Sequence, residues 1–523
     1  MNTAMHESSM RNHDLEKYNN NKRIARNSAF LYFRSIITMI IGFVTSRVVL
    51  QNLGVQDYGI YNVIGGVASM FIFLNTTMSV SISRFLTFEL GKGNSTKLKE
   101  VYSQAKLIHY VLSIVMFILV ECVGLWLIYY KLTIPEDRIS IATYVLHTAA
   151  IGTVLGVIAT PDTALVISHE RMRFFAYISM LDSILRLLAA ILISNIPGNR
   201  LIWYSVFMLL VFGIDRICYL VYCKAKFAET RGKIVYSKSV FRSMISFAGW
   251  NVIGNLANMT REQGLTIIIN IFTNPVVNAA RAVTTQITNS ITAFVFNVRT
   301  AINPQITKAY AEGDYDYMHK LIMFSSLSCF YILLIIFIPL FFISDFLFEI
   351  WLVEVPQYTS VFFRISLIGV LIYSFSNPLI IGIHATGQIV KFQVVEGILL
   401  LTALPLAIVF FQMNYKPVWA YVAIIISNIL TLFGDVLVVL PALRFSKKKY
   451  FCEVLLPALK VSLLAILLPS LGILFNNFYP VAYFSYIISF LSLISSVWIV
   501  YLFGLTRSQR SMVRHKIIKL FHR

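Results

Sequence analysis

Long apolar runs follow one another along almost the whole sequence, and they limit what this chain can fold into. A helix that spans a lipid bilayer needs about 20 predominantly apolar residues, and the sequence offers about fourteen such stretches. Of the 523 residues, 58% are hydrophobic and only 13% are charged. A typical soluble domain has about 25% charged residues. We therefore expect an all-α polytopic membrane protein with about fourteen transmembrane helices.

The expected spans are spread over nearly the whole chain. The first six are placed at 24–50, 58–88, 102–130, 139–167, 173–194 and 201–223. The next six are placed at 239–270, 276–309, 318–343, 358–384, 389–412 and 418–442. The final pair is placed at 452–475 and 480–504. The connections are short, so no soluble domain fits anywhere and the function must lie within the membrane.

Two segments about 220 residues apart carry the same pattern. Ser-Ala-Phe at 28–30 and Ser-Phe-Ala at 246–248 each open an apolar helix. After a short turn, each is followed by a long helix rich in Ser, Thr and Asn. These helices end in Gly-Lys-Gly-Asn at 91–94 and Glu-Gly-Asp-Tyr at 312–315. Both repeats start on the same side, so we expect two pseudo-symmetric, parallel six-helix lobes with the substrate site between them.

The expected domains follow from this repeat and from the two additional helices. They are a cytoplasmic N-terminal segment at 1–23, an N-lobe at 24–224, a cytoplasmic inter-lobe loop at 225–238, a C-lobe at 239–443, a C-terminal helix pair at 444–504 and a basic cytoplasmic tail at 505–523.

Lysine and arginine collect in every second connection. The basic connections lie near 17–26, 92–99, 171–173, 224–238, 444–449 and 507–523, whereas the alternate ones hold Asp57, Glu136, Asp137, Glu349 and Glu354 with few bases. Cytoplasmic loops carry the excess of Lys and Arg, which places both termini in the cytoplasm. The net charge of +20 is therefore attributed to membrane topology, and no nucleic-acid partner is expected.

The sequence gives no sign of catalytic or cofactor chemistry. No pair among the five cysteines has metal-ligand or redox spacing. There is no nucleophile constellation and no Gly-rich phosphate loop, so we expect a transporter with no catalytic residue, no metal and no cofactor. The first apolar run, 24–50, is too long for a cleaved signal and is expected to be a retained helix.

Polar residues recur at helical spacing inside several spans. In hydrocarbon, such groups face the interior of the bundle or a water-filled cavity. Arg281 and Arg299 share one face of the eighth span, about 27 Å apart. The predicted substrate-binding residues are Arg34 and Arg47 in the first span, Asn62 in the second, Asn255 and Glu262 in the seventh, and Arg281, Thr285, Thr288, Thr292 and Arg299 in the eighth.

These assignments have structural alternatives. Single serines and threonines also serve as packing contacts between membrane helices. Arg47 and Arg281 lie near outer helix ends and can snorkel to the interface. Arg261 can simply pair with Glu262.

Other charged residues inside the spans are expected to be structural. Asp182 and Arg186 are four residues apart and can pair with each other. Asp215 lies near the inner third of the sixth span. Asp162 follows Pro161 and marks a predicted kink, because proline removes a backbone hydrogen bond.

The residue types in the stripes suit a particular kind of cargo. The guanidinium of arginine donates two hydrogen bonds in a rigid fork and stays charged, which suits a diphosphate. Hydroxyls and amides exchange hydrogen bonds with sugars without holding them tightly. The stripes therefore favour a substrate with a phosphate head and a sugar chain.

The segment at 45–61, Thr-Ser-Arg-Val-Val-Leu-Gln-Asn-Leu-Gly-Val-Gln-Asp-Tyr-Gly-Ile-Tyr, resembles the junction between the first two helices of polysaccharide flippases. Asn-Ala-Ala-Arg at 278–281 and Asn-Pro-Gln at 303–305 are similar to the eighth helix of that family. These flippases, which include the O-antigen flippases, belong to the multidrug/oligosaccharidyl-lipid/polysaccharide (MOP) exporter superfamily. With the span count and the repeat, the resemblance covers essentially the whole chain.

The resemblance implies a V-shaped pair of lobes that works by alternating access. It implies a flippase that moves polyprenyl-diphosphate-linked oligosaccharide from the cytoplasmic to the periplasmic leaflet of the bacterial inner membrane, for O-antigen lipopolysaccharide, capsule or exopolysaccharide. By matching position, Arg47 and Arg281 engage the diphosphate, and the last two helices hold the polyprenyl tail. Expected partners are this lipid-linked oligosaccharide, membrane lipids, a polysaccharide polymerase and a chain-length regulator.

Two rival functions stay open. A cation-coupled multidrug exporter of the same superfamily relies on an acidic residue in the N-lobe cavity, often on the first helix. Here the first span has Arg34 and no carboxylate before Asp57, which favours an anionic cargo. A membrane-embedded sugar transferase or ligase needs an acid or histidine on an outer loop, and its only plausible acids are Glu136, Asp137, Glu349 and Glu354.

Overall fold

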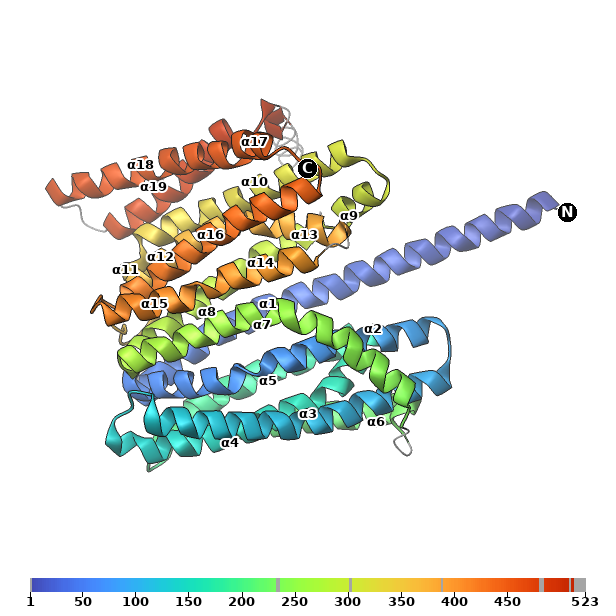
Figure 1. Ribbon diagram of the computed structural model, residues 1–523, viewed down its shortest axis with the longest axis horizontal. Helices are drawn as coiled ribbons and strands as arrows, with labels where there is room; N and C mark the ends of the chain where they lie inside the picture. Colours follow the sequence, from blue (N-terminus) through green and yellow to red (C-terminus); the bar gives the residue numbers. More distant parts are fainter. Residues whose placement is uncertain are drawn as a thin grey trace. The chain divides into compact units, whose positions relative to one another are not determined.

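The computed structural model describes residues 2–231, 236–300, 303–386, 389–478, 484–507 and 509–511 (Figure 1). Side chains are described from residue 34 onward, except at 72–73, 76–77, 80, 84, 91, 246–255, 294–300, 303–304, 311, 477–478 and 485–486. Every regular element in these ranges is a helix. The chain divides into two units, residues 1–252 and 253–523, and each is described by itself. The lobe boundaries inferred from the sequence stay predictions.

The N-terminal unit holds the first six helices and the start of the seventh. They are α1 (Asn2–Ser69), α2 (Ile72–Gly91), α3 (Ser95–Tyr130), α4 (Glu136–Ser168), α5 (Met172–Leu192), α6 (Arg200–Lys226) and the first part of α7 (Lys238–Phe272). Within α1 the backbone leaves the helical conformation at Gly54, with φ 77° and ψ 168°. The predicted first and second spans therefore meet inside α1, and the second continues into α2 after a turn at 70–71.

The C-terminal unit contains the remaining helices. They are the rest of α7, α8 (Pro275–Thr300), α9 (Asn303–Ala311), α10 (Tyr315–Phe342), α11 (Ser344–Trp351), α12 (Thr359–Tyr373), α13 (Ser376–Thr386), α14 (Val390–Leu401), α15 (Ala403–Gln412), α16 (Val418–Ala442), α17 (Lys447–Tyr450), α18 (Leu456–Phe478) and α19 (Phe484–Ile499). Two predicted spans, 358–384 and 389–412, are each built from two helices. Pro378 and Pro405 lie just after the breaks, where their missing N–H groups interrupt the backbone hydrogen bonding.

Eleven helical segments in the described part of the chain are long and apolar enough to cross a bilayer. The predicted spans without a counterpart of their own among these are 58–88, 239–270 and 276–309. The last two correspond to α7 and to α8 with α9, parts of which lie outside the residues whose side chains are described. The all-α, multi-pass fold class is confirmed, whereas the number of fourteen spans is not.

The two turns marked by the internal repeat are built alike. Gly93 has a φ of 66° and Gly313 a φ of 76°, left-handed values that glycine adopts without strain. In each turn, the N–H of the glycine and the next N–H donate to carbonyls in the last turn of the preceding helix, which satisfies groups that a helix end leaves open. Asn94 and Asp314 then cap α3 and α10, each accepting a 3.0 Å hydrogen bond from the N–H three residues later.

In the N-terminal unit, helix α4 packs along α3 and α6 (Figure 1). Small residues allow the close approach. A Cβ atom added at Gly152 would lie 2.8 Å from the Phe212 ring of α6, and one at Gly124 would lie 2.5 Å from Leu146. Pro161 is accommodated inside α4, which runs unbroken to Ser168.

Candidate functional site

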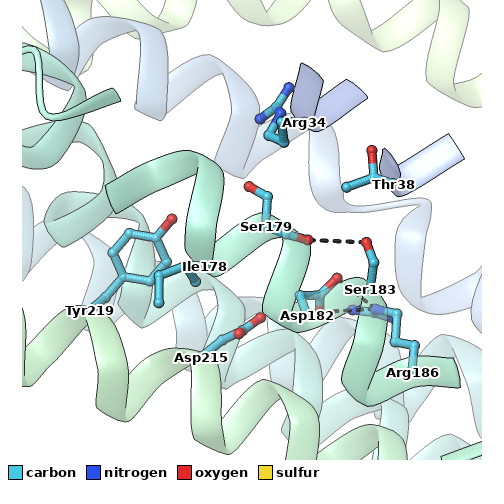
Figure 2. A pocket seen from close by; sticks show the side chains of 9 residues that line it. All are labelled: Arg34, Thr38, Ile178, Ser179, Asp182, Ser183, Arg186, Asp215 and Tyr219. Carbon is cyan, nitrogen blue, oxygen red and sulfur yellow. Dashed lines mark hydrogen bonds and ion pairs between the residues drawn. The ribbon is translucent and has the colours of Figure 1, made fainter. Parts of the chain in front are cut away.

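A cavity of about 430 Å³ lies within the N-terminal unit, with walls from α1, α5 and α6 (Figure 2). It is lined by Arg34, Thr38, Ile178, Ser179, Asp182, Ser183, Arg186, Asp215 and Tyr219. All but one of these side chains are polar or charged. Such a lining inside a membrane-spanning bundle is typical of a solvated cavity or a substrate pathway.

Arg34 is the predicted substrate-binding residue that lines this cavity. Its guanidinium carbon lies 4.9 Å from the centre of the Phe175 ring on α5. Its Nε is buried without a hydrogen-bond partner, and its electrostatic partner among the described residues is a tyrosine, Tyr219, with no carboxylate beside it. The positive charge of Arg34 therefore remains available to an anion that enters the cavity.

Arg186 and Asp182 form an ion pair on the opposite wall. The Nε of Arg186 donates to both carboxylate oxygens of Asp182, at 2.9 Å each. The guanidinium also lies against the sulfur of Met208 and 5.2 Å from the centre of the Phe212 ring. The predicted pairing of these residues is confirmed, and it leaves the pair with no net charge to offer.

Asp215 faces the same cavity from α6 (Figure 2). Its carboxyl group interacts with that of Asp182, and its Oδ1 is buried without a hydrogen-bond partner. Both acids were expected to be structural, and it was not predicted that they line one cavity with Arg34. Their depth in the membrane could have predicted it. They lie in consecutive, antiparallel spans, each about 15 Å from the helix end on the same side of the membrane.

A second charged cluster lies in the C-terminal unit, on α7 and α8. The Glu262 carboxylate accepts one hydrogen bond from Arg261 and another from Arg281, both at 3.1 Å. Arg281 also donates from Nε to the Thr266 hydroxyl at 2.9 Å. Arg261 donates to the Asn428 side chain at 3.1 Å. Glu262 and Arg281, two of the predicted substrate-binding residues, thus form one network with Arg261, whose pairing with Glu262 was the structural alternative.

The remaining predicted residues are placed as follows. Arg47 is exposed on α1, and Thr285 is half-buried on α8. Asn62 donates to the Tyr58 carbonyl at 2.7 Å. Thr288 and Thr292 each donate to the carbonyl four residues earlier. The side chains of Asn255 and Arg299 lie outside the described residues.

Hydroxyls bonded in this way keep their oxygen free to accept. In the N-terminal cavity, Ser179 and Ser183 also donate to carbonyls of their own helix, at 2.8 and 3.0 Å. A serine oxygen that donates its only proton still has lone pairs for a ligand O–H or N–H. These side chains therefore present hydrogen-bond acceptors to the cavity.

Asp162 is the most buried acid of the N-terminal unit, at 1% exposure. Its carboxylate accepts hydrogen bonds from Tyr102 and Arg216, and Lys106 lies 4.0 Å away. Because both carboxylate oxygens are paired, this cluster joins α3, α4 and α6 and has no free oxygen to offer to a ligand. Among the described side chains, no group of three or more His, Cys, Asp or Glu residues is placed to hold a metal ion.

Residues 24–310 match the family described as "Polysaccharide biosynthesis protein". The chain belongs to this family. None of the curated proteins matches the chain. Among solved structures, this chain is similar to "Lipid II flippase MurJ, inward closed conformation". The TM-score is 0.65, and the sequences are 14% identical over 92% of this chain and 98% of that one.

Two further solved structures resemble this chain. An inward-facing multidrug resistance MATE family transporter of the MOP superfamily matches with a TM-score of 0.63 and 13% identity, over 79% of this chain and 99% of that one. A MOP superfamily transporter from Pyrococcus furiosus matches with a TM-score of 0.56 and 12% identity, over 80% of this chain and 96% of that one. The expected MOP superfamily fold is confirmed, and these neighbours are a flippase and transporters rather than enzymes. The sugar transferase alternative therefore finds no support.

Proposed function

We propose that this chain is a flippase that carries a polyprenyl-diphosphate-linked oligosaccharide from the cytoplasmic to the periplasmic leaflet of the bacterial cytoplasmic membrane by alternating access. Family membership supports a role in polysaccharide biosynthesis. The observation that carries the proposal is Arg34, an arginine in a polar cavity with no carboxylate partner among the described residues. Both termini are assigned to the cytoplasm, and the surface polysaccharide supplied is an O-antigen, capsule or exopolysaccharide.

The chemistry of the cavity fits the head of such a lipid. The fork of the Arg34 guanidinium donates charge-assisted hydrogen bonds to a phosphate. Thr38, Ser179 and Ser183 offer weak acceptors to sugar hydroxyls along the same walls. Weak, numerous contacts suit a carrier, because a substrate that is bound tightly is released slowly.

A deletion strain tests the proposal. Wild-type protein is expected to restore surface polysaccharide, whereas Arg34→Gln is expected to leave the lipid-linked oligosaccharide in the inner leaflet. Arg364→Gln is the matched control. That arginine belongs to the C-terminal unit, is bonded to the Phe341 carbonyl and to Asp345, and does not line the cavity, so export is expected to stay near normal. Normal export by an inserted Arg34→Gln variant would contradict the proposal.

Asp215 favours a second candidate function, a cation-coupled exporter of the same superfamily. Its partner-free carboxyl oxygen faces the N-terminal cavity, where a bound cation would be stabilised. Asp215→Asn separates the candidates. A drug exporter is expected to lose drug resistance with this change. A flippase for an anionic head is expected to bind its diphosphate at least as well, because a negative charge has been removed from the cavity.

A further inference from the structure

The Glu262 carboxylate bridges two arginines in the C-terminal unit, one oxygen to each. The distances are 3.1 Å from Arg261 to Oε1 and 3.1 Å from Arg281 to Oε2. Two guanidinium groups therefore share this carboxylate as their directly bonded acid, and Glu396 interacts with Arg261 only through the electrostatic field.

The three side chains differ sharply in exposure. The arginine side chains are 10% and 5% exposed for Arg261 and Arg281, whereas the Glu262 side chain is 40% exposed. The carboxylate therefore forms the open side of the cluster. A ligand that approaches from that side meets Glu262 first and reaches the arginines by taking its place.

Neutral groups hold the arginines independently of this carboxylate. The Nε of Arg281 donates to the Thr266 hydroxyl, and its guanidinium carbon lies 5.8 Å from the centre of the Tyr421 ring. Arg261 donates to Asn428, at 3.1 Å. Withdrawal of the Glu262 side chain would leave both guanidinium groups in place.

The carboxylate does not satisfy all the donors around it. The Nε of Arg261 is buried without a hydrogen-bond partner, and the residue is only 8% exposed. An unpaired buried donor destabilises the state in which it occurs. A carboxylate has two oxygens, and both are already used. An anion with more oxygens and more charge can reach this third donor as well.

We infer that Arg261 and Arg281 form an anion site that the Glu262 carboxylate occupies in the empty protein, and that a diphosphate group displaces it on loading. The inference rests on the proposed function for the identity of the cargo. A diphosphate brings more negative charge and more acceptor oxygens than one carboxylate. The Glu262 side chain is already 40% exposed, so few packing contacts hold it in the cluster when the ligand arrives.

This arrangement explains why the site contains an acid at all. Two buried guanidinium groups without a counter-ion would destabilise the empty carrier. An internal carboxylate supplies that counter-ion and also lowers the apparent affinity for the cargo, because binding must first displace it. A lower affinity speeds release on the far side of the membrane.

The test is diphosphate binding to the purified full-length protein in lipid nanodiscs. Farnesyl diphosphate and inorganic pyrophosphate serve as probes with the same head, with and without an isoprenoid tail. Glu262→Gln keeps the shape of the side chain and removes its charge, so both probes are expected to bind about tenfold more tightly. Glu349→Gln, which changes an exposed acid on α11, is expected to leave binding unchanged. Tighter binding of farnesyl diphosphate alone would show that the tail, not the anion site, responds to the change, and would contradict the inference.

A thermal-unfolding measurement covers the case in which Glu262→Gln is poorly stable. Farnesyl diphosphate is expected to raise its unfolding temperature more than that of wild type, because the ligand restores the missing counter-ion. An equal or smaller rise, or unchanged affinity, overturns the inference but leaves the proposed function intact. Loss of the gene without any effect on surface polysaccharide would instead overturn the proposed function.

Discussion

The Nε of Arg186 lies 2.9 Å from each carboxylate oxygen of Asp182, so the charge of this cavity arginine is already paired. Because Arg186 is committed to Asp182, Arg34 is the cavity arginine left for a ligand. The electrostatics of the N-terminal cavity therefore depend on which charges are paired as much as on which are present.

The first prediction concerns this pair. Asp182→Asn alone is expected to destabilise the protein, because it leaves Arg186 without its counter-ion. Adding Arg186→Gln is expected to recover part of the loss, with a coupling of about 1 kcal/mol. Thermal unfolding of the purified single and double variants measures it. Strictly additive effects would show that the ion pair contributes nothing to stability.

The second prediction concerns the arginines of the first and eighth spans. Arg47→Gln and Arg281→Gln are each expected to reduce polysaccharide export at least about tenfold, since a charge-assisted contact contributes about 1.5–3 kcal/mol. Protein levels in the membrane are expected to stay near wild type for Arg47→Gln, which changes an exposed residue. Export at the normal rate would rule out a role for these guanidinium groups in holding the diphosphate.

The third prediction concerns the matched turns. Gly93→Ala and Gly313→Ala are each expected to destabilise the protein by about 1 kcal/mol, because alanine is strained at positive φ. A Cβ atom at either position would meet nothing within 4 Å, so the cost is in the backbone and not in a clash. Asparagine tolerates this conformation better, so Gly→Asn is expected to cost less at both sites. Equal effects of Ala and Asn in thermal unfolding would argue against this explanation.

The fourth prediction concerns the approach of α4 to α6. Gly152→Val is expected to destabilise the protein by about 1–3 kcal/mol through overpacking, since a Cβ atom there lies 2.8 Å from Phe212. Phe212 also contacts Arg186, so the change should disturb the cavity as well. Gly156→Val is the control, because nothing lies within 4 Å of a Cβ atom at that position. Similar unfolding temperatures for the two variants would contradict the prediction.

The fifth prediction concerns Glu229, beyond the end of α6. Burial raises the pKa of this carboxyl group, but hydrogen bonds from His169 and from its own backbone N–H lower it more, so the pKa lies below its usual 4.5. A depressed pKa in the folded state stabilises the protein above pH 4.5, and that contribution is lost as the pH falls through the folded pKa. Glu229→Gln is expected to remove this part of the acid sensitivity. An unchanged dependence of unfolding on pH would show that other groups dominate.

Local signals in the sequence predicted much of the fold. Apolar runs placed most of the helices, and the repeated glycines placed the turns at Gly93 and Gly313 correctly. The breaks before Pro378 and Pro405 were missed because the apolar run continues across them, and hydropathy does not register the loss of a backbone hydrogen bond. The merging of the first two spans into α1 was missed for a similar reason, since a single non-helical residue, Gly54, separates them.

The candidate site was predictable only in part. Helical spacing identified Arg34, Arg281 and Glu262 and the pairing of Asp182 with Arg186, because positions on one helix follow from its period. It did not identify the approach of Asp215 to Asp182, which depends on how α5 and α6 are rotated against each other. Rotation about a helix axis is set by packing, which no single span encodes.

The turns at Gly93 and Gly313 are closed by backbone hydrogen bonds between residues at most five positions apart. Such a turn requires nothing from distant parts of the chain. It can therefore form as soon as its own segment has been synthesised, before the neighbouring helices exist. Each half of the protein thus carries its own signal for reversing direction during membrane insertion, and an error in one half need not propagate to the other.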